Sequence, residues 1–219
     1  MQVGLIGGTG PAGRALAARL ASVGVDVIMG SRSAERAHEI VDELLGKWPD
    51  HQLRCVGAAN ERAVNAEIVV LATPWESAPA MAASLAEHLA GKVVISMANA
   101  LIKVGDELQP LVLARGSVAA EVQASAPRAM VAAAFQHLPS RHLGDIAHPI
   151  ESDVLICSDH PPATKAVADL IRQIPGLRPI DAGTLAAAAP VEAFTAVLAS
   201  VNIRYRARSA VRLTGIDSS

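Results

Sequence analysis

The stretch MQVGLIGGTGPAGRALAARLASVGVDVIMGSR, residues 1–32, decides the fold of this chain. A short apolar run, Val3–Ile6, leads directly into Gly8–Gly13, which fits the G-x-G-x-x-G pattern of a dinucleotide-binding turn. The amphipathic stretch Ala15–Val23 and a second apolar run, Val27–Met29, follow. Together they predict a strand–helix–strand unit of about 30 residues, the first unit of a Rossmann-type fold.

Each glycine of this turn has an expected role. Gly8 permits the tight turn out of the strand, Gly10 lets the backbone approach the phosphates, and Gly13 lets the helix pack close to the strand. Pro11 suits a first helical position, where no backbone N–H is required. The free N–H groups of the helix start attract an anion. The predicted pyrophosphate-binding residues are Gly8, Thr9, Gly10, Pro11, Ala12 and Gly13.

The end of the second strand predicts which dinucleotide binds. NAD-binding chains usually carry Asp or Glu there to hold the ribose 2′-hydroxyl, but this chain has Gly30-Ser31-Arg32. Ser31 can donate to a 2′-phosphate, and Arg32 can pair with it through two N–H groups. Arg36 lies four residues on, so a helix starting near Ser33 puts it on the same face. We therefore predict NADP, although both arginines could also be ordinary solvated charges.

Apolar runs alternate with alanine-rich stretches along the rest of the chain. The candidate strands are Val3–Ile6, Val27–Met29, Leu53–Val56, Ile68–Ala72, Val93–Ser96, Met130–Ala133, Val154–Cys157 and Arg178–Ile180. The candidate helices are Pro11–Val23, Ala34–Leu45, Ser77–Leu89, Val118–Ala126 and Ala163–Ile174. This alternation predicts an α/β fold with a doubly wound, mostly parallel sheet. We expect an NADP-binding domain over residues 1–182 and a small helical appendage over 183–219.

Composition narrows the class of protein. Aromatic residues make up only 2% of the 219 residues, so the core must consist of Ala, Val, Leu and Ile. The net charge of −2 argues against a nucleic acid or an anionic membrane as partner. Cys55 and Cys157 form no C-x-x-C pair, and the histidines fit no metal-ligand spacing. With no uninterrupted apolar stretch of about 18 residues and no signal peptide, we expect a cytoplasmic protein.

Ligands of open α/β sheets bind beyond the carboxyl ends of the strands. This rule selects Thr73-Pro74-Trp75, Ser96–Asn99 and Phe135–Pro139, each directly after a predicted strand. We expect all three segments to face the cofactor. Trp75 could instead be a core or interface aromatic, and Asn99 could be a turn residue.

Several motifs carry a family resemblance. They are GLIGGTGPAG at Gly4–Gly13, GSR at Gly30–Arg32, TPWE at Thr73–Glu76, GKVVIS at Gly91–Ser96, GLRPIDAG at Gly176–Gly183, and the tail from Asn202 to Gly215. With these motifs the chain resembles the NADPH-dependent reductases of coenzyme F420, a deazaflavin. The first half alone would also suit pyrroline-carboxylate or ketopantoate reductases.

The resemblance implies a function. Enzymes of that family pass a hydride between the nicotinamide C4 of NADP(H) and the deazaflavin C5, and they are homodimers. By resemblance, the NADP site consists of Thr9, Gly10, Pro11, Ala12, Ser31, Arg32, Arg36, Pro74 and Asn99. The deazaflavin pocket is expected between Gln136–Pro139 and the C-terminal helices, which also contribute to the dimer contact.

Hydride transfer between two stacked rings needs little acid–base chemistry from the protein. We accordingly assign no catalytic residue and no metal ligand. Reduction of a carbonyl would need a proton donor, and His137 is the one candidate we name. Two alternatives remain open: an NADPH-dependent reductase of an imine, a ketone or a flavin, and an NADP-binding sensor without turnover.

Overall fold

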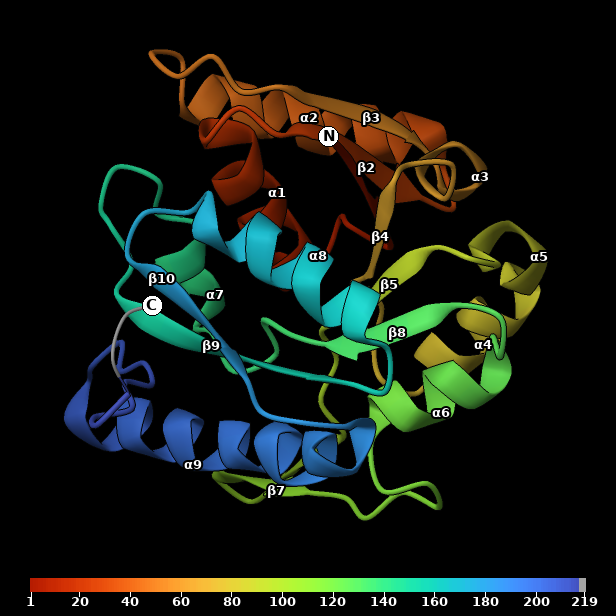
Figure 1. Ribbon diagram of the computed structural model, residues 1–219. Coiled ribbons are helices and arrows are strands. Elements are labelled where there is room, and N and C mark those ends of the chain that lie inside the picture. The colour runs from red at the N-terminus through yellow and green to blue at the C-terminus, as the bar shows by residue number, and fades with distance from the viewer. Residues whose placement is uncertain (217–219) are drawn as a thin grey trace.

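An eight-stranded sheet runs through the molecule between two layers of helices (Figure 1). The structure, a computed structural model, describes residues 1–216. The strand order is β10-β9-β8-β5-β4-β1-β2-β3, and the strands are β1 (Gln2–Ile6), β2 (Asp26–Ser31), β3 (Cys55–Ala59), β4 (Ile68–Leu71), β5 (Val93–Ser96), β8 (Met130–Ala133), β9 (Ser152–Ser158) and β10 (Leu177–Asp181). All neighbouring strands pair in parallel except β8 and β9. The predicted doubly wound, mostly parallel sheet is confirmed.

The central strands are buried on both faces. In β1, Val3 and Leu5 pack into the core on one side of the sheet, while Ile6 packs into the core on the other side. In β4, Ile68 and Val69 likewise pack into the cores on opposite sides of the sheet. This two-sided burial explains why these strands are continuous apolar runs rather than alternating patterns.

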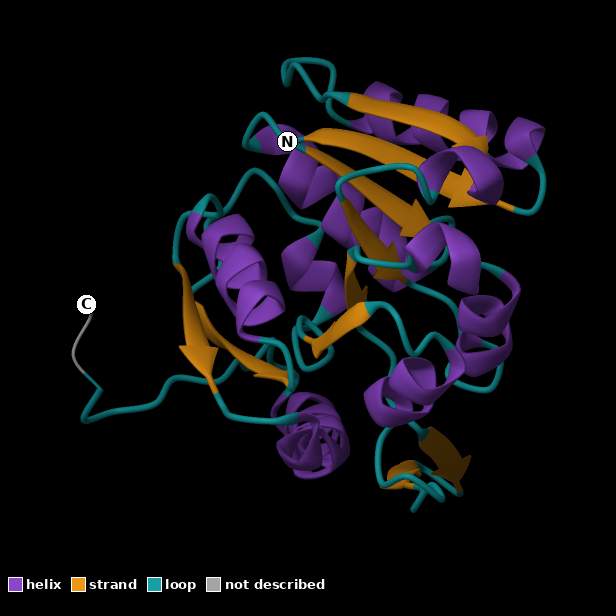
Figure 2. Ribbon diagram, turned by 45° about the vertical axis from the view of Figure 1, so that its right-hand side comes forward, coloured by secondary structure: helices purple, strands orange, loops and turns teal. Residues whose placement is uncertain are grey.

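Helices cover both faces of the sheet (Figure 2). The first layer holds α1 (Pro11–Ser22), α2 (Ala34–Lys47) and α8 (Pro161–Arg172). The second layer holds α3 (Asn60–Ala63), α4 (Ala78–Ser84), α5 (Ala86–Leu89) and α6 (Val118–Ser125). Small residues let the layers approach closely: a Cβ added at Gly57 of β3 would lie 2.5 Å from the Ala37 carbonyl carbon of α2.

Some predicted boundaries were wrong. The strand predicted at Leu53–Val56 runs from Cys55 to Ala59, because Gly57 and its small neighbours pack under α2 despite their weak hydrophobic pattern. The single helix predicted at Ser77–Leu89 breaks at Leu85, next to a Ser84 hydroxyl that donates back to a helix carbonyl.

Short elements escaped the sequence analysis altogether. They are α3, α7 (Ser140–Leu143), and a two-stranded hairpin of β6 (Leu101–Val104) and β7 (Glu107–Pro110). Each strand or helix among them has four residues, too few to establish a periodic pattern.

The C-terminal segment is one short turn and one long helix, η1 (Leu185–Ala187) and α9 (Ala188–Tyr205). The helix packs beside β7, and the chain then returns to the sheet, where Val211 accepts a hydrogen bond from the Asp153 backbone N–H at 2.7 Å. The predicted helical appendage, 183–219, is thus one helix with a returning tail, and its residues 217–219 lie outside the described residues. The division at residue 182 stays a prediction.

By length and apolar composition, residues Leu185–Tyr205 would suffice to cross a membrane, with a mean hydropathy of 1.5. No uninterrupted apolar stretch of about 18 residues is expected from the sequence. The helix is nevertheless fastened to the rest of the fold by Glu192, which is buried and accepts hydrogen bonds from the N–H groups of Val118 and Ala119. Burial raises the pKa of Glu192 to about 7. Composition alone is weak evidence for a membrane helix.

Candidate functional site

Three loops meet at the carboxyl edge of the sheet and enclose a cavity of about 300 Å³. They follow β1, β4 and β5, and β1 lies where the chain order of the strands reverses. This is the ligand-binding position of doubly wound sheets. The cavity is lined by Gly10, Pro11, Ala12, Ala72, Thr73, Pro74, Trp75, Met97, Ala98 and Asn99. Trp75 and Asn99 are half-buried and line this cavity, and Trp75 also packs against the core on that side of the sheet.

The glycine that makes the turn after β1 differs from the predicted one. The positive φ of +68° belongs to Gly7, so Gly7 rather than Gly8 makes the left-handed turn. A Cβ at Gly8 would come within 2.9 Å of the Leu5 side chain, and one at Gly13 within 2.6 Å of the Gly8 carbonyl oxygen. Gly13 thus allows close packing, as predicted. At Gly10 an added Cβ would meet nothing within 4 Å, so this glycine faces open space.

The start of α1 presents free N–H groups beside that open space. Gly10 is the N-cap residue, no side chain caps the helix, and its first turn contains no acidic residue. Arg14 donates from Nε to the Thr9 carbonyl at 2.7 Å, which holds the loop in place. Unsatisfied N–H groups, a favourable helix dipole and absent Cβ atoms together suit a pyrophosphate.

The predicted 2′-phosphate residues lie around the end of β2. Ser31 is its last residue and is buried, with Oγ 3.4 Å from the Ser33 N–H that donates to it. Arg32 is exposed directly after it. Arg36 lies in the first turn of α2, as predicted, but it pairs with Glu39 at 2.9 Å. Arg32 is therefore the freer of the two arginines for a phosphate.

A hydrogen-bonded junction joins the cavity to the C-terminal helix. Asn99 donates from Nδ2 to the Gln136 carbonyl at 2.8 Å, and Thr195 of α9 donates to Asn99 Oδ1 at 3.3 Å. These bonds orient the Asn99 amide, since its nitrogen must face one partner and its oxygen the other. Thr195 was missed by the sequence analysis, because a threonine within an alanine-rich helix carries no motif.

The side chain of Gln136 is enclosed but unpaired. It is 4% exposed, and neither its Oε1 nor its Nε2 has a hydrogen-bond partner within residues 1–216. A buried amide without partners is costly, so a ligand that offers both a donor and an acceptor would stabilise it. Pro139, the other residue predicted in this segment, is the N-cap of α7 and is half-buried.

His137 does not line the cavity described above. Its ring is 2% exposed, and its Nε2 lies 2.9 Å from the carbonyl oxygen of Asp153 in β9. Burial lowers the pKa of His137, which favours the neutral ring. Asp153 is itself held by Arg178 at 2.7 Å and by the tail. The histidine thus fastens the segment after β8 to β9.

One further supporting residue is Asn60, which the sequence analysis did not identify. This buried side chain accepts a hydrogen bond from the Gly7 N–H at 3.2 Å, so α3 supports the turn after β1. Among residues 1–216, His, Cys, Asp and Glu side chains form no group of three that could hold a metal ion.

Comparisons with known proteins identify the family of this chain. A family model described as NADP oxidoreductase, coenzyme F420-dependent, matches residues 2–100. The F420-dependent NADP reductase of Methanocaldococcus jannaschii is 34% identical, covering 99% of this chain and 100% of the relative. That of Methanothermobacter marburgensis is 35% identical, covering 99% of both chains.

A solved structure supports the fold. The crystal structure of a protein from Arthrobacter sp. FB24 is similar, with a TM-score of 0.81 at 24% identity, and the match covers 97% of this chain and 98% of that one. Because the sequence match to the curated relatives runs along the whole chain, it includes the loop after β1 and the helix α9 alike. The chain belongs to the F420-dependent NADP reductase family.

Proposed function

We propose that this chain transfers a hydride between NADP(H) and coenzyme F420. The observation that carries the proposal is the junction of Asn99, Gln136 and Thr195, which joins the dinucleotide-type cavity to a second, buried polar position beneath α9. When bound, the nicotinamide and the deazaflavin supply the hydride chemistry themselves. The protein has to bind both rings, hold them in register and exclude water.

On the NADP side, the geometry supports the following proposed roles. The N–H groups at the start of α1 bind the pyrophosphate beside Gly10, where no side chain intrudes. Ser31 and Arg32 bind the 2′-phosphate, and Arg36 adds a weaker contact. Thr73, Pro74, Trp75 and Asn99 line the cavity that holds the nicotinamide.

On the acceptor side, Gln136 and Pro139 bind the deazaflavin. The pyrimidine part of this ring carries an imide N–H between two carbonyl groups, so it offers the donor and the acceptors that the Gln136 amide lacks. The helix α9 lies beside this position through Thr195 and closes it. Orientation of this kind supplies much of the rate of a two-ring transfer, where small displacements are costly.

The reduced deazaflavin gains a hydride at C5 and a proton at a ring nitrogen, so no general acid beside a carbonyl oxygen is required. The buried, neutral His137, held against β9, fits an enzyme that leaves it out of the chemistry. A reductase of ketones or imines would need a donor in the cavity.

A turnover assay tests this function directly. We expect NADPH to reduce purified coenzyme F420 in the presence of the protein, followed as the loss of the deazaflavin absorbance at the edge of the visible range. Parallel reactions contain a free flavin, a ketone or a cyclic imine as the acceptor. NADPH consumption with one of these and none with the deazaflavin would assign another acceptor, and NADP binding without any turnover would indicate a sensor.

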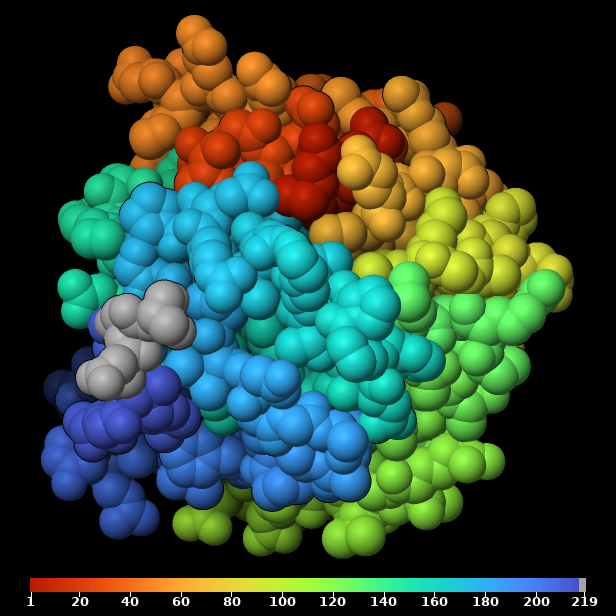
Figure 3. Space-filling view, in the orientation of Figure 1, coloured from red at the N-terminus to blue at the C-terminus, as the bar shows by residue number. Residues whose placement is uncertain are grey.

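We further propose that the enzyme is a cytoplasmic homodimer that pairs through α9. The helix exposes Val197, Ile203 and Tyr205, the last two by 66% and 75%. Figure 3 shows α9 (blue) at the surface along the lower side of the molecule, with residues of the hairpin region (yellow-green) beneath it. Large exposed apolar surfaces mark contacts with other proteins. A location in the cytoplasm fits the two charged substrates, because charged molecules do not cross a membrane unaided.

Charge on this surface should dissociate the dimer. We expect wild-type protein to sediment as a dimer and a Val197→Glu/Ile203→Glu variant as a folded monomer, since each carboxylate would be desolvated in the contact. Val56→Glu is the matched control, because Val56 is 47% exposed on β3, the strand at one edge of the sheet. A monomeric wild type, or a dimer unaffected by the double substitution, would contradict this interface.

A further inference from the structure

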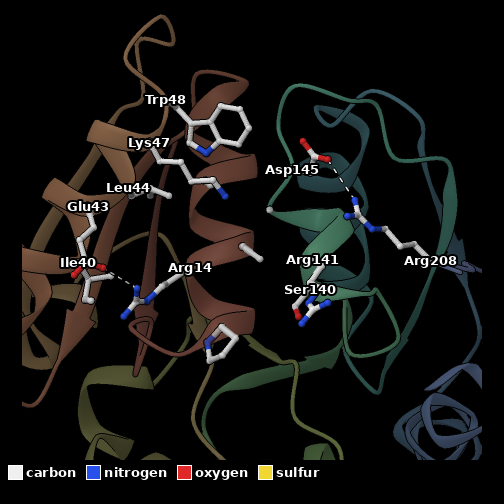
Figure 4. A pocket seen from close by; sticks show the side chains of 14 residues that line it. Arg14, Ile40, Glu43, Leu44, Lys47, Trp48, Ser140, Arg141, Asp145 and Arg208 are labelled. Atoms are coloured by element: carbon white, nitrogen blue, oxygen red, sulfur yellow. Dashed lines mark hydrogen bonds and ion pairs between the residues drawn. The ribbon is translucent and has the colours of Figure 1, made fainter. Parts of the chain in front are cut away.

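A second and larger cavity, of about 630 Å³, lies between α1, α2 and α7. Figure 4 shows it from close by, with side chains from all three helices along its walls. Pro11 lines this cavity and also the smaller cavity at the carboxyl edge of the sheet, so the two meet at the start of α1. The charged residues in its lining are Arg14, Glu43, Lys47, Arg141, Asp145 and Arg208. We call this cavity the α1–α2–α7 groove.

The groove is basic, although the chain as a whole carries a net charge of −2. Four basic side chains line it and only two acidic ones. Both acidic groups are engaged, since Glu43 pairs with Arg14 at 3.0 Å and Asp145 pairs with Arg208 at 3.4 Å. Two cations remain, Lys47 and Arg141, for which Figure 4 draws no ion pair. They form an excess of positive charge within a concave surface, which attracts anions.

The wall around Lys47 is apolar and aromatic. The Lys47 ammonium lies 5.1 Å from the centre of the Trp48 ring, and Ile40 and Ala18 are buried nearby in the same lining. The Trp48 indole N–H is buried and has no acceptor within residues 1–216. A ligand for this groove therefore combines methylene groups with several acidic oxygens.

We propose that the groove binds the acidic side chain of coenzyme F420, which carries a phosphodiester followed by glutamyl carboxylates. The inference rests on the proposed function and adds a binding site to it. Ser140 and Arg141 begin α7 directly after Gln136–Pro139, the segment proposed to hold the ring. The side chain of a ring bound there reaches the mouth of the groove next to Pro11.

The dimensions agree with this occupant. From Pro11 to Ala18 the groove follows α1 for about 10 Å, at a rise of about 1.5 Å per residue. An extended chain of three or four units covers this distance at roughly 3.3 Å per unit. NADP does not compete for the far end, because α2 separates Lys47 from the predicted 2′-phosphate residues at its start by about 20 Å.

Comparing two deazaflavins distinguishes binding in the groove from binding at the ring position. Coenzyme F420 carries the acidic side chain, whereas the deazaflavin alcohol obtained by removing the phosphate and glutamates lacks it. For each, the dissociation constant is measured by calorimetry and KM by NADPH-dependent reduction. The test variant is Lys47→Ala/Arg141→Ala. Its control is Lys165→Ala/Arg172→Ala, which makes the same change in net charge on the exposed side of α8.

We expect the test variant to raise the dissociation constant and KM for coenzyme F420 about tenfold, the effect of two exposed ion pairs. The values for the alcohol and the kcat of both substrates should stay within about twofold. In wild-type protein, added salt should weaken coenzyme F420 binding more than alcohol binding.

Other outcomes overturn the proposal in distinguishable ways. Equal losses for both deazaflavins, or no loss for either, would mean that the groove does not hold the acidic side chain while the proposed function stands. An equal loss in the control variant would show a long-range charge effect instead of a site. If wild-type protein bound and reduced neither deazaflavin, the proposed function itself would fail, and this inference with it.

Discussion

Substituting Gly10 by valine should abolish NADP(H) binding and leave the fold intact. The backbone of Gly10 has φ −75° and ψ 168°, which valine adopts without strain, and an added Cβ meets no atom within 4 Å. The new side chain would instead occupy the space next to the N–H groups of α1. Loss of two charge-assisted hydrogen bonds at about 1.5–3 kcal/mol each predicts a drop in affinity of at least a hundredfold, roughly 3 kcal/mol or more.

The control is Gly46→Val in α2, where an added Cβ also meets nothing within 4 Å. Calorimetry with NADPH measures binding, and thermal unfolding without ligand measures stability. Gly10→Val should melt close to the wild-type temperature without binding, while Gly46→Val should bind normally. A Gly10→Val protein that keeps its melting temperature and its NADPH affinity would show that the pyrophosphate lies elsewhere.

Substituting Arg32 by alanine should discriminate between the two dinucleotides. Arg32 is exposed at the end of β2, and no acidic residue stands in Gly30-Ser31-Arg32. Removing its guanidinium should weaken NADP binding by about 1.5–3 kcal/mol, the range for a hydrogen bond to a charged group. NAD binding should hardly change, because NAD lacks the 2′-phosphate. Competition calorimetry with both dinucleotides measures the two effects in the same variant.

Arg36→Ala is the graded control for this experiment. Arg36 already pairs with Glu39 at 2.9 Å, so part of its charge is compensated before a phosphate arrives. We expect it to lose less NADP affinity than Arg32→Ala. Equal losses of NADP and NAD affinity in Arg32→Ala would remove the arginine from the 2′-phosphate site.

The parts of the fold that the sequence predicts are those with a local pattern. Val3–Ile6 and the glycines that follow predict a buried strand, a turn and a helix within a few residues. The structure contains all three at these positions. Gly57 has no such local pattern. It lies in a strand because a neighbouring helix needs its missing side chain, and that need becomes visible only when α2 and β3 are brought together.

The residues of the site also fall into two groups, those that a local sequence pattern predicts and those that it does not. Gly10, Pro74 and Asn99 follow strands directly, so the rule about the carboxyl ends of parallel strands predicts their meeting. Thr195 and Asn60 contribute through contacts with residues far away in the sequence, 96 positions for Thr195 and 53 for Asn60. No local pattern marks such residues. From the sequence, His137 is a candidate proton donor. Its hydrogen bond to the Asp153 carbonyl in β9 depends on how the strands pack, which the periodicity of the sequence does not reveal.

Isotopic labelling tests whether the hydride passes directly from one ring to the other. The protein is incubated with coenzyme F420 and NADPH carrying deuterium at the nicotinamide C4, each of the two C4 epimers in a separate reaction. Mass spectrometry then locates the label in the reduced deazaflavin. We predict that one epimer delivers its deuterium to the deazaflavin C5 in full and that the other delivers none. Deuterium released into water, or a deazaflavin that stays oxidised while NADPH is consumed, would contradict direct hydride transfer between the two rings.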